Sequence, residues 1–573
     1  MIRLLTPRKA AGDALADRLN MPHPTAFLII AFMLLTRTLL PAQGASERFR
    51  WFFFMEKTQV QSPALSPEGT IYIGTGLGET SLPSDGVYAV NPDGTQKWKM
   101  TLGKSVHSSV ALDRNGNLYL IVGDANNPDR MNAALYSLDA LGRLRWIFEN
   151  IGWMAPVPNT GFTPAIAEDG TLYVCGLYSL FAVDSIGRMK WKYDFPLIDH
   201  VNSSGVIQTT GSNRSAPTVA KDGTIYVNTK KGWHGGIEAE GGIFAFDPDG
   251  NLEWRTYDVG GCAAPIIGED GTVYAAIGRY ENAADTSDWT AASREAKLLA
   301  IHPDGTPKWS VTTLLWIQAS PSIGADGTLY AGTSHHPLNK PGWVYAITPE
   351  GRIRWKYDTY DDVKDMPQAQ QNAPDIYNSP LVDSNGLIYF GNEIGLFYAL
   401  TPEGKQAWIE NVSSLLYSSP ALADDGTLYV ASHEKIALDH YGLIALNTGS
   451  HGLADSPWPK FRQNNANTGN ALPSEQPGSA GHAGMPGIFD LYPNCPNSFN
   501  SETVIPYSLS ASSETQLMIV DVSGRPVTTL VDEWRLPGSY RAVFDGRELP
   551  SGVYFCHLRA GAQKKTIKIL MVK

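Results

Sequence analysis

The hydrophobic residues of this chain fall into short runs separated by glycine turns, and the same pattern recurs along most of its length. The first clear copy occupies residues 62–98 and contains SPALSPEGTIYIGTG followed by VYAVNPDGTQKW. Each half of the copy places two runs rich in Val, Ile, Tyr and Thr around a glycine, which accepts the positive φ of a tight hairpin turn. One copy therefore predicts an antiparallel sheet of four strands.

Eight copies of this pattern follow one another at intervals of 40 to 59 residues, and such a period indicates a repeat architecture. The glycine of the first turn falls at Gly69, Gly116, Gly170, Gly223, Gly271, Gly327, Gly386 and Gly426. Strands such as TIYIG are apolar on both faces, so neighbouring sheets must cover both sides of each sheet. Because radially stacked four-stranded sheets form a β-propeller, we predict an all-β chain with an eight-bladed β-propeller over residues 46–470.

A tryptophan marks the last strand of seven copies, at Trp98, Trp146, Trp191, Trp254, Trp309, Trp355 and Trp408. The last copy, residues 419–447, lacks this tryptophan, whereas Trp51 stands ahead of the first copy in RFRWFFFM. We therefore expect the N-terminal segment to supply the outer strand of the last blade, which closes the ring and removes a bare sheet edge.

The pattern S-P-x-x-x-x-D-G-T-x-Y-V, followed by A-x-x-x-x-G-x-x-x-W, resembles the pyrroloquinoline-quinone-like β-propeller family over about residues 50–470. This quinoprotein-like family includes dehydrogenases and a non-enzymatic outer-membrane assembly propeller. The segment SPWPKFRQNNANTGN at residues 456–470 is similar to a strap that closes or covers such propellers. The resemblance implies the fold but leaves the activity open, because one fold hosts many functions.

The long insertions between strands are expected on one face of the disc, which we call the looped face. In a meander the second turns and the connections between blades lie on the same face, and long loops on a rigid scaffold commonly bind ligands. The insertions are residues 123–133, 197–213, 229–241, 278–296, 333–342 and 357–376. The candidate binding residues expected on this face are Trp153, Trp233, His234, Trp289, Trp316, His335, His336 and Trp343. Aromatic platforms with polar neighbours suit a sugar, a peptide or a planar ligand, and the alternative is that these tryptophans only hold the loops to the disc.

The residues just ahead of each S-P motif are expected to surround the mouth of the central channel on the looped face. They are Gln61, His107, Phe162, Arg214, Cys262, Gln318, Asn378 and Ser418. This predicted ring contains no carboxylate. We include Gln61, His107, Arg214, Gln318 and Asn378 among the candidate ligand-binding residues.

Cofactor chemistry is not expected from these residues. The resemblance implies that the family's dehydrogenases hold pyrroloquinoline quinone (PQQ) over calcium with acidic and amide side chains, with a catalytic Asp and often a disulfide of adjacent cysteines. The chain has no adjacent cysteine pair, and calcium needs several oxygen ligands. We therefore expect no cofactor, no metal and no catalytic residue, and reserve PQQ and calcium for the dehydrogenase alternative.

The net charge of −12, from 45 basic and 57 acidic residues, argues against binding to nucleic acid or to anionic membrane surfaces. The sequence also lacks the G-x-S-x-G, H-E-x-x-H, P-loop and C-x-x-C motifs. The last insertion also contains an acidic run, Asp358, Asp361, Asp362 and Asp365.

Residues 471–487, ALPSEQPGSAGHAGMPG, predict a flexible linker, and residues 488–573 contain short alternating strands that predict a small β-sandwich. The phrases YPNCPNSFNSETVIPYSL, VDVSGRPVTTLV and KKTIKILMVK resemble the type IX secretion C-terminal sorting domain. They also resemble the related immunoglobulin-like domain of flagellar hook-capping proteins. The sorting resemblance implies export across both membranes of the envelope, and the alternative is a spacer or interaction domain.

Residues 1–45 are predicted to be a signal peptide region, because the apolar run at residues 26–35 is too short to span a bilayer. Translation from Met21 and a membrane-anchored N-terminus are the alternatives. An oxidising location would permit a bridge between Cys495 and Cys556. Cys175 and Cys262 fall in non-adjacent blades and are expected to be unpaired.

The leading hypothesis is an exported, secreted or cell-surface propeller that binds a polysaccharide or a surface protein without catalysis. Its export machinery would act through the C-terminal domain, and the mature chain would carry no transmembrane anchor. The alternatives are a quinone-dependent dehydrogenase of alcohols or sugars and a polysaccharide hydrolase or lyase. Paired carboxylates would serve the last alternative, but the sequence places no two of them together.

Overall fold

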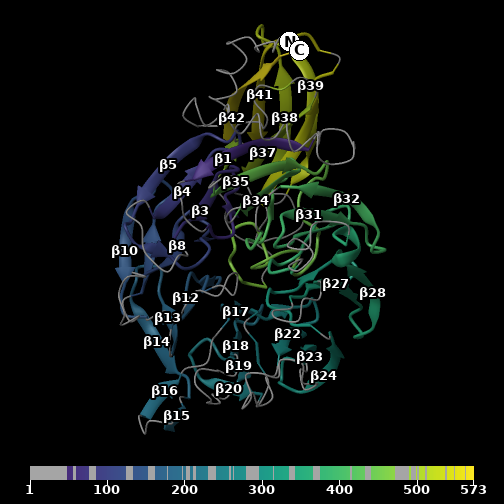
Figure 1. Ribbon diagram of the computed structural model, residues 1–573. Helices are drawn as coiled ribbons and strands as arrows, with labels where there is room; N and C mark the ends of the chain where they lie inside the picture. Colours follow the sequence, from purple (N-terminus) through teal and green to yellow (C-terminus); the bar gives the residue numbers. More distant parts are fainter. Residues whose placement is uncertain are drawn as a thin grey trace, which may run out of the picture. The chain divides into compact units, whose positions relative to one another are not determined.

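The computed structural model of the 573-residue chain contains β-strands almost throughout and one short 3-10 helix, η1 (Thr359–Asp362), among the described residues (Figure 1). The described residues are 48–55, 60–76, 85–123, 133–151, 162–176, 179–196, 198–201, 207–210, 215–229, 241–256, 260–261, 263–278, 296–313, 315–334, 342–364, 375–412, 416–432, 441–471, 489–491, 499, 502–509, 513–535, 538–547, 549–561 and 563–572. The all-β prediction is confirmed. The chain divides into two compact units, residues 1–472 and 473–573, which we describe separately.

Each of the first seven sequence copies forms an antiparallel sheet with four consecutive strands, and the last copy forms its sheet with the N-terminal strand. Sheet 1 contains β2 (Ala64–Leu65), β3 (Ile71–Gly74), β4 (Gly86–Val90) and β5 (Gln96–Thr101). Sheet 2 contains β7 (Ala111–Leu112), β8 (Leu118–Gly123), β9 (Ala134–Leu138) and β10 (Leu144–Phe148), with β6 (Ser105–Val106) also paired to β8. Sheet 3 contains β11 (Ala165–Ile166), β12 (Leu172–Cys175), β13 (Ser179–Val183) and β14 (Met189–Asp194). Sheet 4 contains β17 (Thr218–Val219), β18 (Ile225–Thr229), β19 (Gly242–Phe246) and β20 (Leu252–Arg255).

The remaining sheets of the first unit follow the same order. Sheet 5 contains β21 (Ile266–Ile267), β22 (Val273–Gly278), β23 (Ala296–Ile301) and β24 (Pro307–Thr312). Sheet 6 contains β25 (Ser322–Ile323), β26 (Leu329–Gly332), β27 (Trp343–Ile347) and β28 (Ile353–Asp358), and sheet 7 contains β29 (Leu381–Val382), β30 (Ile388–Gly391), β31 (Leu396–Leu400) and β32 (Gln406–Asn411). A two-stranded hairpin, β15 (Ile198–Val201) and β16 (Ile207–Thr210), lies between sheets 3 and 4 in the chain. Figure 1 shows the sheets following one another around a common centre in chain order.

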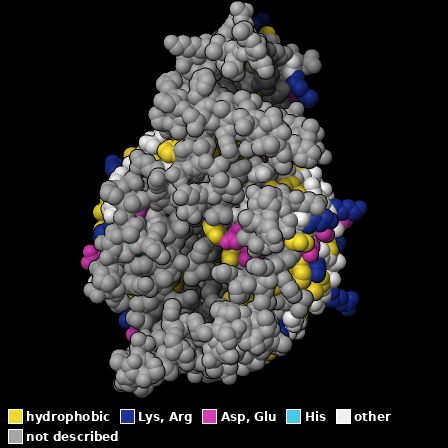
Figure 2. Space-filling model, in the orientation of Figure 1, with side chains coloured by type: hydrophobic (Ala, Val, Ile, Leu, Met, Phe, Trp, Pro, Cys, Tyr) yellow, Lys and Arg dark blue, Asp and Glu magenta, His cyan; other side chains and the backbone are white. Residues whose placement is uncertain are grey.

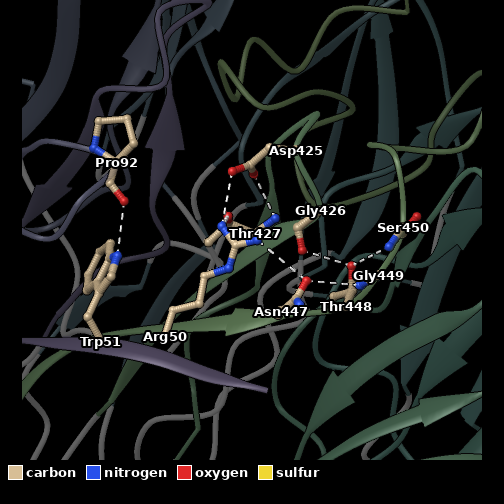
Figure 3. Close-up of polar contacts among 10 residues, drawn as sticks. All are labelled: Arg50, Trp51, Pro92, Asp425, Gly426, Thr427, Asn447, Thr448, Gly449 and Ser450. Atoms are coloured by element: carbon tan, nitrogen blue, oxygen red, sulfur yellow. Dashed lines mark hydrogen bonds and ion pairs between the residues drawn. The ribbon is translucent and has the colours of Figure 1, made fainter. Parts of the chain in front are cut away.

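Sheet 8 combines the two ends of the repeat region. It contains β33 (Ala421–Leu422), β34 (Thr427–Ser432) and β35 (Tyr441–Asn447), and its outer strand is β1 (Phe49–Met55), which pairs antiparallel with β35. Arg50 on β1 donates hydrogen bonds to Thr427 and, at 3.1 Å, to Asp425 (Figure 3). The predicted position of the N-terminal strand is confirmed.

The tryptophan of each outer strand joins its sheet to the next one. The indole Nε1 of Trp51 on sheet 8 donates to the carbonyl of Pro92 on sheet 1 at 3.0 Å (Figure 3). The same contact repeats from Trp98 to Ala140, Trp146 to Ser185, Trp191 to Pro248, Trp254 to Pro303, Trp309 to Pro349, and Trp355 to Pro402. On sheet 7, Trp408 lies 4.7 Å from the guanidinium of Arg48, just ahead of β1. These contacts therefore connect all eight sheets in one closed sequence.

The segment at residues 456–471 lies across the ends of the inner strands. The final backbone N–H of the inner strand in six sheets donates to a carbonyl of this segment, from Leu65, Leu112, Ile166, Val219, Ile323 and Val382. Its Lys460 and Arg462 are buried, and the Arg462 guanidinium donates to the carbonyls of Pro217 and Pro164. Backbone pairing with several sheets at once explains why this segment acts as a strap.

The second unit contains two sheets that share one hydrophobic core. One sheet contains β36 (Asp490–Leu491), β37 (Glu502–Leu509) and β40 (Gly538–Asp545), and the other contains β38 (Ser513–Val520), β39 (Pro526–Arg535), β41 (Gly552–Ala560) and β42 (Gln563–Met571). Buried Ile505, Leu517 and Ile569 belong to the same cluster. Cys556 is a free, buried thiol there, so the bridge that the sequence permits is not formed.

The predicted signal region and most of the predicted linker lie outside the described residues. Within the part of the chain that the structure describes, no helix has both the length and the apolar character needed to cross a membrane.

Candidate functional site

A short turn in sheet 7 places a carboxyl group beside the start of an inner strand. The turn at residues 392–395 joins β30 to β31, and the Asn392 side chain fixes it by accepting a hydrogen bond from the Leu396 backbone at 2.9 Å. Gly395 completes the turn with a φ of +86°, a conformation that glycine adopts without strain. The backbone N–H of Glu393 then donates to the carbonyl of Asp375 at 3.0 Å, ahead of β29.

Two tyrosines complete the group that we call the acid–tyrosine cluster, which consists of Asp375, Tyr377, Glu393 and Tyr417. The Tyr417 hydroxyl donates to Glu393 Oε1 at 2.5 Å, and the Tyr377 hydroxyl donates to Asp375 Oδ2 at 3.3 Å. The two rings lie 5.3 Å apart between centroids and are tilted by 53°. Tyr417 precedes β33, so the cluster joins the starts of the inner strands of sheets 7 and 8.

The cluster alters the ionisation of its members. The pKa of the Glu393 carboxyl is raised to about 7, chiefly by burial and to a smaller extent by the charge of Asp375, while the hydrogen bond from Tyr417 lowers it. Burial also raises the pKa of the Tyr377 hydroxyl far above its ordinary value, with the charges of Asp375 and Glu393 acting in the same direction. Glu393 can therefore gain or lose a proton near neutral pH.

Asp375 is buried, whereas Tyr377, Glu393 and Tyr417 are partly exposed. Partly exposed aromatic rings beside hydrogen-bonding carboxyl groups offer the two kinds of contact that a sugar ring uses, an apolar face and polar hydroxyls. A carboxyl group with a strongly perturbed pKa is also a common marker of a functional site. The cluster is therefore the candidate site that these residues support best.

The looped face is the expected location of this site. Figure 2 shows acidic and hydrophobic side chains gathered beside a hollow near the centre of the face turned to the viewer. Carboxylates and apolar groups thus reach solvent together on this side of the molecule.

The predicted channel-mouth residues make mostly structural contacts where the structure describes them. Buried Asn378 donates from its side-chain amide to the carbonyls of Gly391 and Leu416, at 2.8 and 2.7 Å. Buried Gln61 likewise donates to the carbonyl of Val106 at 3.1 Å. His107 is buried, and this burial lowers its pKa to about 4. Such contacts join neighbouring sheets through their inner strands.

Three other predicted residues are partly exposed. Gln318 and Trp316 lie in the connection between sheets 5 and 6, where the Trp316 carbonyl accepts a hydrogen bond from the Ser334 backbone at 2.8 Å. Trp343 begins β27, and the Lys356 ammonium lies 3.7 Å from its ring centroid. The structure therefore brings Trp343 together with a cation.

The other predicted ligand-binding residues lie outside the described residues, namely Trp153, Trp233, His234, Trp289, His335, His336 and Arg214. Their role stays a prediction. No group of three or more His, Cys, Asp or Glu side chains suited to a metal ion occurs within the described ranges.

The sequence analysis did not predict the acid–tyrosine cluster, although three of its residues lie within three positions of predicted channel-mouth residues. Tyr377 and Tyr417 each stand one residue ahead of the predicted mouth residues Asn378 and Ser418, and Asp375 stands three residues ahead of Asn378. The predicted ring contained no carboxylate, and the structure places two near it. One feature of the sequence could have indicated the cluster. The second turn of the seventh copy, which carries Glu393, is short, and a short turn keeps its side chains close to the start of the inner strand.

The comparison with known families follows the division into two units. Residues 50–276 and 208–450, which together span most of the chain, match the family described as outer membrane protein assembly factor BamB. The chain belongs to this family. In addition, residues 490–573 match the family described as secretion system C-terminal sorting domain. The repeat region is therefore a BamB-like β-propeller, and its tail is the type IX sorting domain that the sequence resembles.

Solved structures with similar folds include BamB from Moraxella catarrhalis, with 17% identity and a TM-score of 0.44 over 69% of this chain and 96% of that chain. PorZ, an essential bacterial surface component of the type IX secretion system of Porphyromonas gingivalis, has 12% identity and a TM-score of 0.35 over 91% of this chain and 75% of its own. The Dos1 propeller has 12% identity and a TM-score of 0.46 over 71% and 97% of the two chains. No curated protein matches the chain significantly. The sorting domain indicates a secreted or cell-surface protein and the involvement of export machinery.

Proposed function

We propose that this protein is a surface-displayed or secreted eight-bladed propeller that binds a polysaccharide on its looped face without catalysis. The acid–tyrosine cluster carries the proposal, because its partly exposed rings and its carboxyl groups match the chemistry of a sugar. A surface protein is the other partner class that a looped face accommodates.

The closed sequence of tryptophan contacts supports a ring of eight blades over residues 46–470. A rigid ring holds Tyr377 and Tyr417, which belong to neighbouring sheets, at a fixed separation. We also propose that the two sheets of residues 488–573 form the sorting sandwich, that residues 471–487 link it to the ring, and that residues 1–45 direct export.

A thermal-shift panel on the full chain with soluble glycans of different composition tests the binding proposal. A glycan at 100 times its dissociation constant stabilises the folded state by about 2.7 kcal/mol, which a thermal scan detects readily. The proposal requires at least one glycan to raise the melting temperature of wild type and to raise it less for Tyr417→Ala. Trp534→Ala is the control, because Trp534 is an exposed aromatic residue of the second unit and belongs to none of the looped-face insertions. An unchanged melting temperature with every glycan contradicts the proposal and favours a protein partner.

Polysaccharide hydrolysis is a second candidate, favoured by the proximity of Asp375 and Glu393. Glycoside hydrolysis uses two carboxyl groups, one of which has a raised pKa and donates the proton, and the pKa of Glu393 is raised to about 7. Release of reducing ends from a bound glycan by wild type, and its loss in Glu393→Gln, would establish this activity. Binding without release of reducing ends supports the non-catalytic function.

The dehydrogenase alternative depends on PQQ and calcium. Thermal scans with calcium plus PQQ, run beside the glycan panel, test it directly. A rise in melting temperature with these additions would replace the non-catalytic proposal.

A further inference from the structure

The acid–tyrosine cluster is connected to sheet 6 through η1, the short helix that follows β28. The first residue of η1, Thr359, is buried and donates from its hydroxyl to the carbonyl of Gly342 at 2.8 Å. The next residue of that strand, Trp343, exchanges hydrogen bonds with Thr333. The Thr333 carbonyl in turn accepts the backbone N–H of Ile376 at 3.2 Å, and Ile376 lies between the Asp and the first Tyr of the cluster. Hydrogen bonds along β27 therefore connect η1 to the cluster.

A second route between η1 and the cluster runs through side chains. Asp362, the last residue of η1, accepts a hydrogen bond from the Tyr357 hydroxyl at 2.8 Å. The Tyr357 ring lies 6.0 Å from the ring of Tyr398, whose hydroxyl accepts a hydrogen bond from the Asn392 amide at 3.3 Å. Asn392 directly precedes Glu393 of the cluster. The short turn of sheet 7 thus contacts the surroundings of η1 as well as the cluster.

The same elements share a hydrophobic core beneath this surface. Val363, which follows η1, is fully buried in one cluster of side chains with Ile376 and Tyr398. Close-packed side chains resist displacement, so this core holds η1 and the acid–tyrosine cluster at a fixed separation. A ligand that contacts both would therefore meet a preformed surface, which lowers the cost of binding.

η1 presents one aromatic ring to solvent. Tyr360 is 39% exposed, and its backbone is held on both sides. Its N–H donates to the carboxylate of Asp358 at 3.0 Å, and its carbonyl accepts the N–H of Val363 at 3.0 Å. An exposed aromatic ring on a fixed backbone is a platform on which a sugar ring can stack.

The charges along this surface are mainly negative. The carboxyl groups of η1, its cap and the cluster are Asp358, Asp361, Asp362, Asp375 and Glu393. Two cations accompany them, Lys364, which pairs with Asp361 at 3.5 Å, and Lys356 beside the ring of Trp343. An anionic polysaccharide would meet like charges here, whereas the hydroxyl groups of a neutral one can donate hydrogen bonds to the carboxylates.

We propose that η1 is a second sugar-binding subsite with Tyr360 as its platform, and that the ligand is a neutral oligosaccharide long enough to contact η1 and the acid–tyrosine cluster together. This inference rests on the proposed function, because it extends the site that carries that function. Two subsites that bind one chain make affinity depend on chain length, since the second contact becomes intramolecular once the first has formed.

Isothermal titration of the full chain tests this length dependence. The ligands are oligosaccharides of two and of six units from the cello, malto, xylo and manno series, all of which are neutral. In at least one series the six-unit ligand should bind wild type at least tenfold more tightly than the two-unit ligand. Tyr360→Ala should weaken binding of the six-unit ligand at least fivefold and leave that of the two-unit ligand within twofold. Trp534→Ala, at an exposed aromatic residue of the second unit, is the control and should change neither dissociation constant.

Tyr417→Ala separates this inference from the proposed function, because it should weaken binding of both lengths. If neither length binds, or if Tyr417→Ala leaves both dissociation constants unchanged, the proposed function fails and the second subsite fails with it. If Tyr417→Ala weakens binding but Tyr360→Ala leaves the six-unit ligand unaffected, the proposed function stands and the second subsite is refuted.

A conservative variant and an acidic ligand test the chemistry of the subsite. Tyr360→Phe keeps the ring, so its affinity for the six-unit ligand should stay within threefold of wild type. A loss equal to that of Tyr360→Ala would contradict stacking on the ring. Hexagalacturonate, which carries one carboxylate on each unit, should bind at least tenfold more weakly than the neutral six-unit ligand. Equal or tighter binding of hexagalacturonate would overturn the assignment of a neutral ligand.

Discussion

The Glu393 carboxyl gives the site a pH dependence that can be measured as stability. Its pKa is raised from 4.5 to about 7 in the folded protein, mainly by burial. Below pH 4.5 the group is protonated in both states, and its ionisation costs no stability. As the pH rises from 4.5 to 7 the unfolded chain loses its proton first, so the folded state is progressively destabilised. The full penalty is present above pH 7.

The expected size follows from the shift. Each pKa unit corresponds to 1.36 kcal/mol, so a rise of about 2.5 units predicts at most about 3 kcal/mol of destabilisation between pH 4.5 and 8. Glu393→Gln removes the ionisation while it keeps an oxygen that accepts the Tyr417 hydrogen bond. The melting temperature of the variant relative to wild type should therefore increase with pH across this window.

Differential scanning of both proteins at pH 4.5, 5.5, 6.5, 7.5 and 8 makes this measurement. The difference between the two melting temperatures cancels the contributions of all other titrating groups. Glu403→Gln, at an exposed turn, is the control of opposite sign: a hydrogen bond with Thr401 lowers the pKa of Glu403, so the melting temperature of this variant relative to wild type should not increase with pH. A difference for Glu393→Gln that likewise fails to increase with pH would refute the assignment of a raised pKa to this carboxyl.

Three further predictions concern the ring, the strap and the tail. Trp51→Ala should destabilise the propeller by about 3 to 5 kcal/mol in thermal unfolding, because Trp51 is 8% exposed and joins sheets 8 and 1. Trp534→Ala, at a 68% exposed position, is the control and should cost less than about 1 kcal/mol. Gly469→Ala should lower the melting temperature more than Gly449→Ala, since both have positive φ but a Cβ at Gly469 would overlap the Arg462 guanidinium. Removal of residues 490–573 should leave the chain in the periplasm in cell fractionation, and surface display without them would contradict sorting by this tail.

The repeat pattern made much of the fold predictable. Periodicity identified the eight copies, and the missing tryptophan of the last copy indicated that Trp51 supplies its outer strand. Both inferences needed only local residues and their spacing, because each sheet forms from consecutive strands.

The candidate site was less predictable for a physical reason. Glu393 is an ordinary residue in a short turn, and its raised pKa comes mainly from its burial in the folded protein, while the Asp375 and Tyr417 groups that also act on it are 18 and 24 residues away. Only the stacking of sheets 7 and 8 brings them together. In the same way, Asn378 was a sound choice by position, but its amide is used by the backbone of neighbouring strands.

Isothermal titration of the full chain with the glycan that gives the largest thermal shift tests the central proposal most directly. We predict a single class of site whose dissociation constant rises at least tenfold in Tyr377→Ala and in Tyr417→Ala and stays within twofold in Trp534→Ala. Equal affinity of all four proteins would show that the acid–tyrosine cluster is not the binding site.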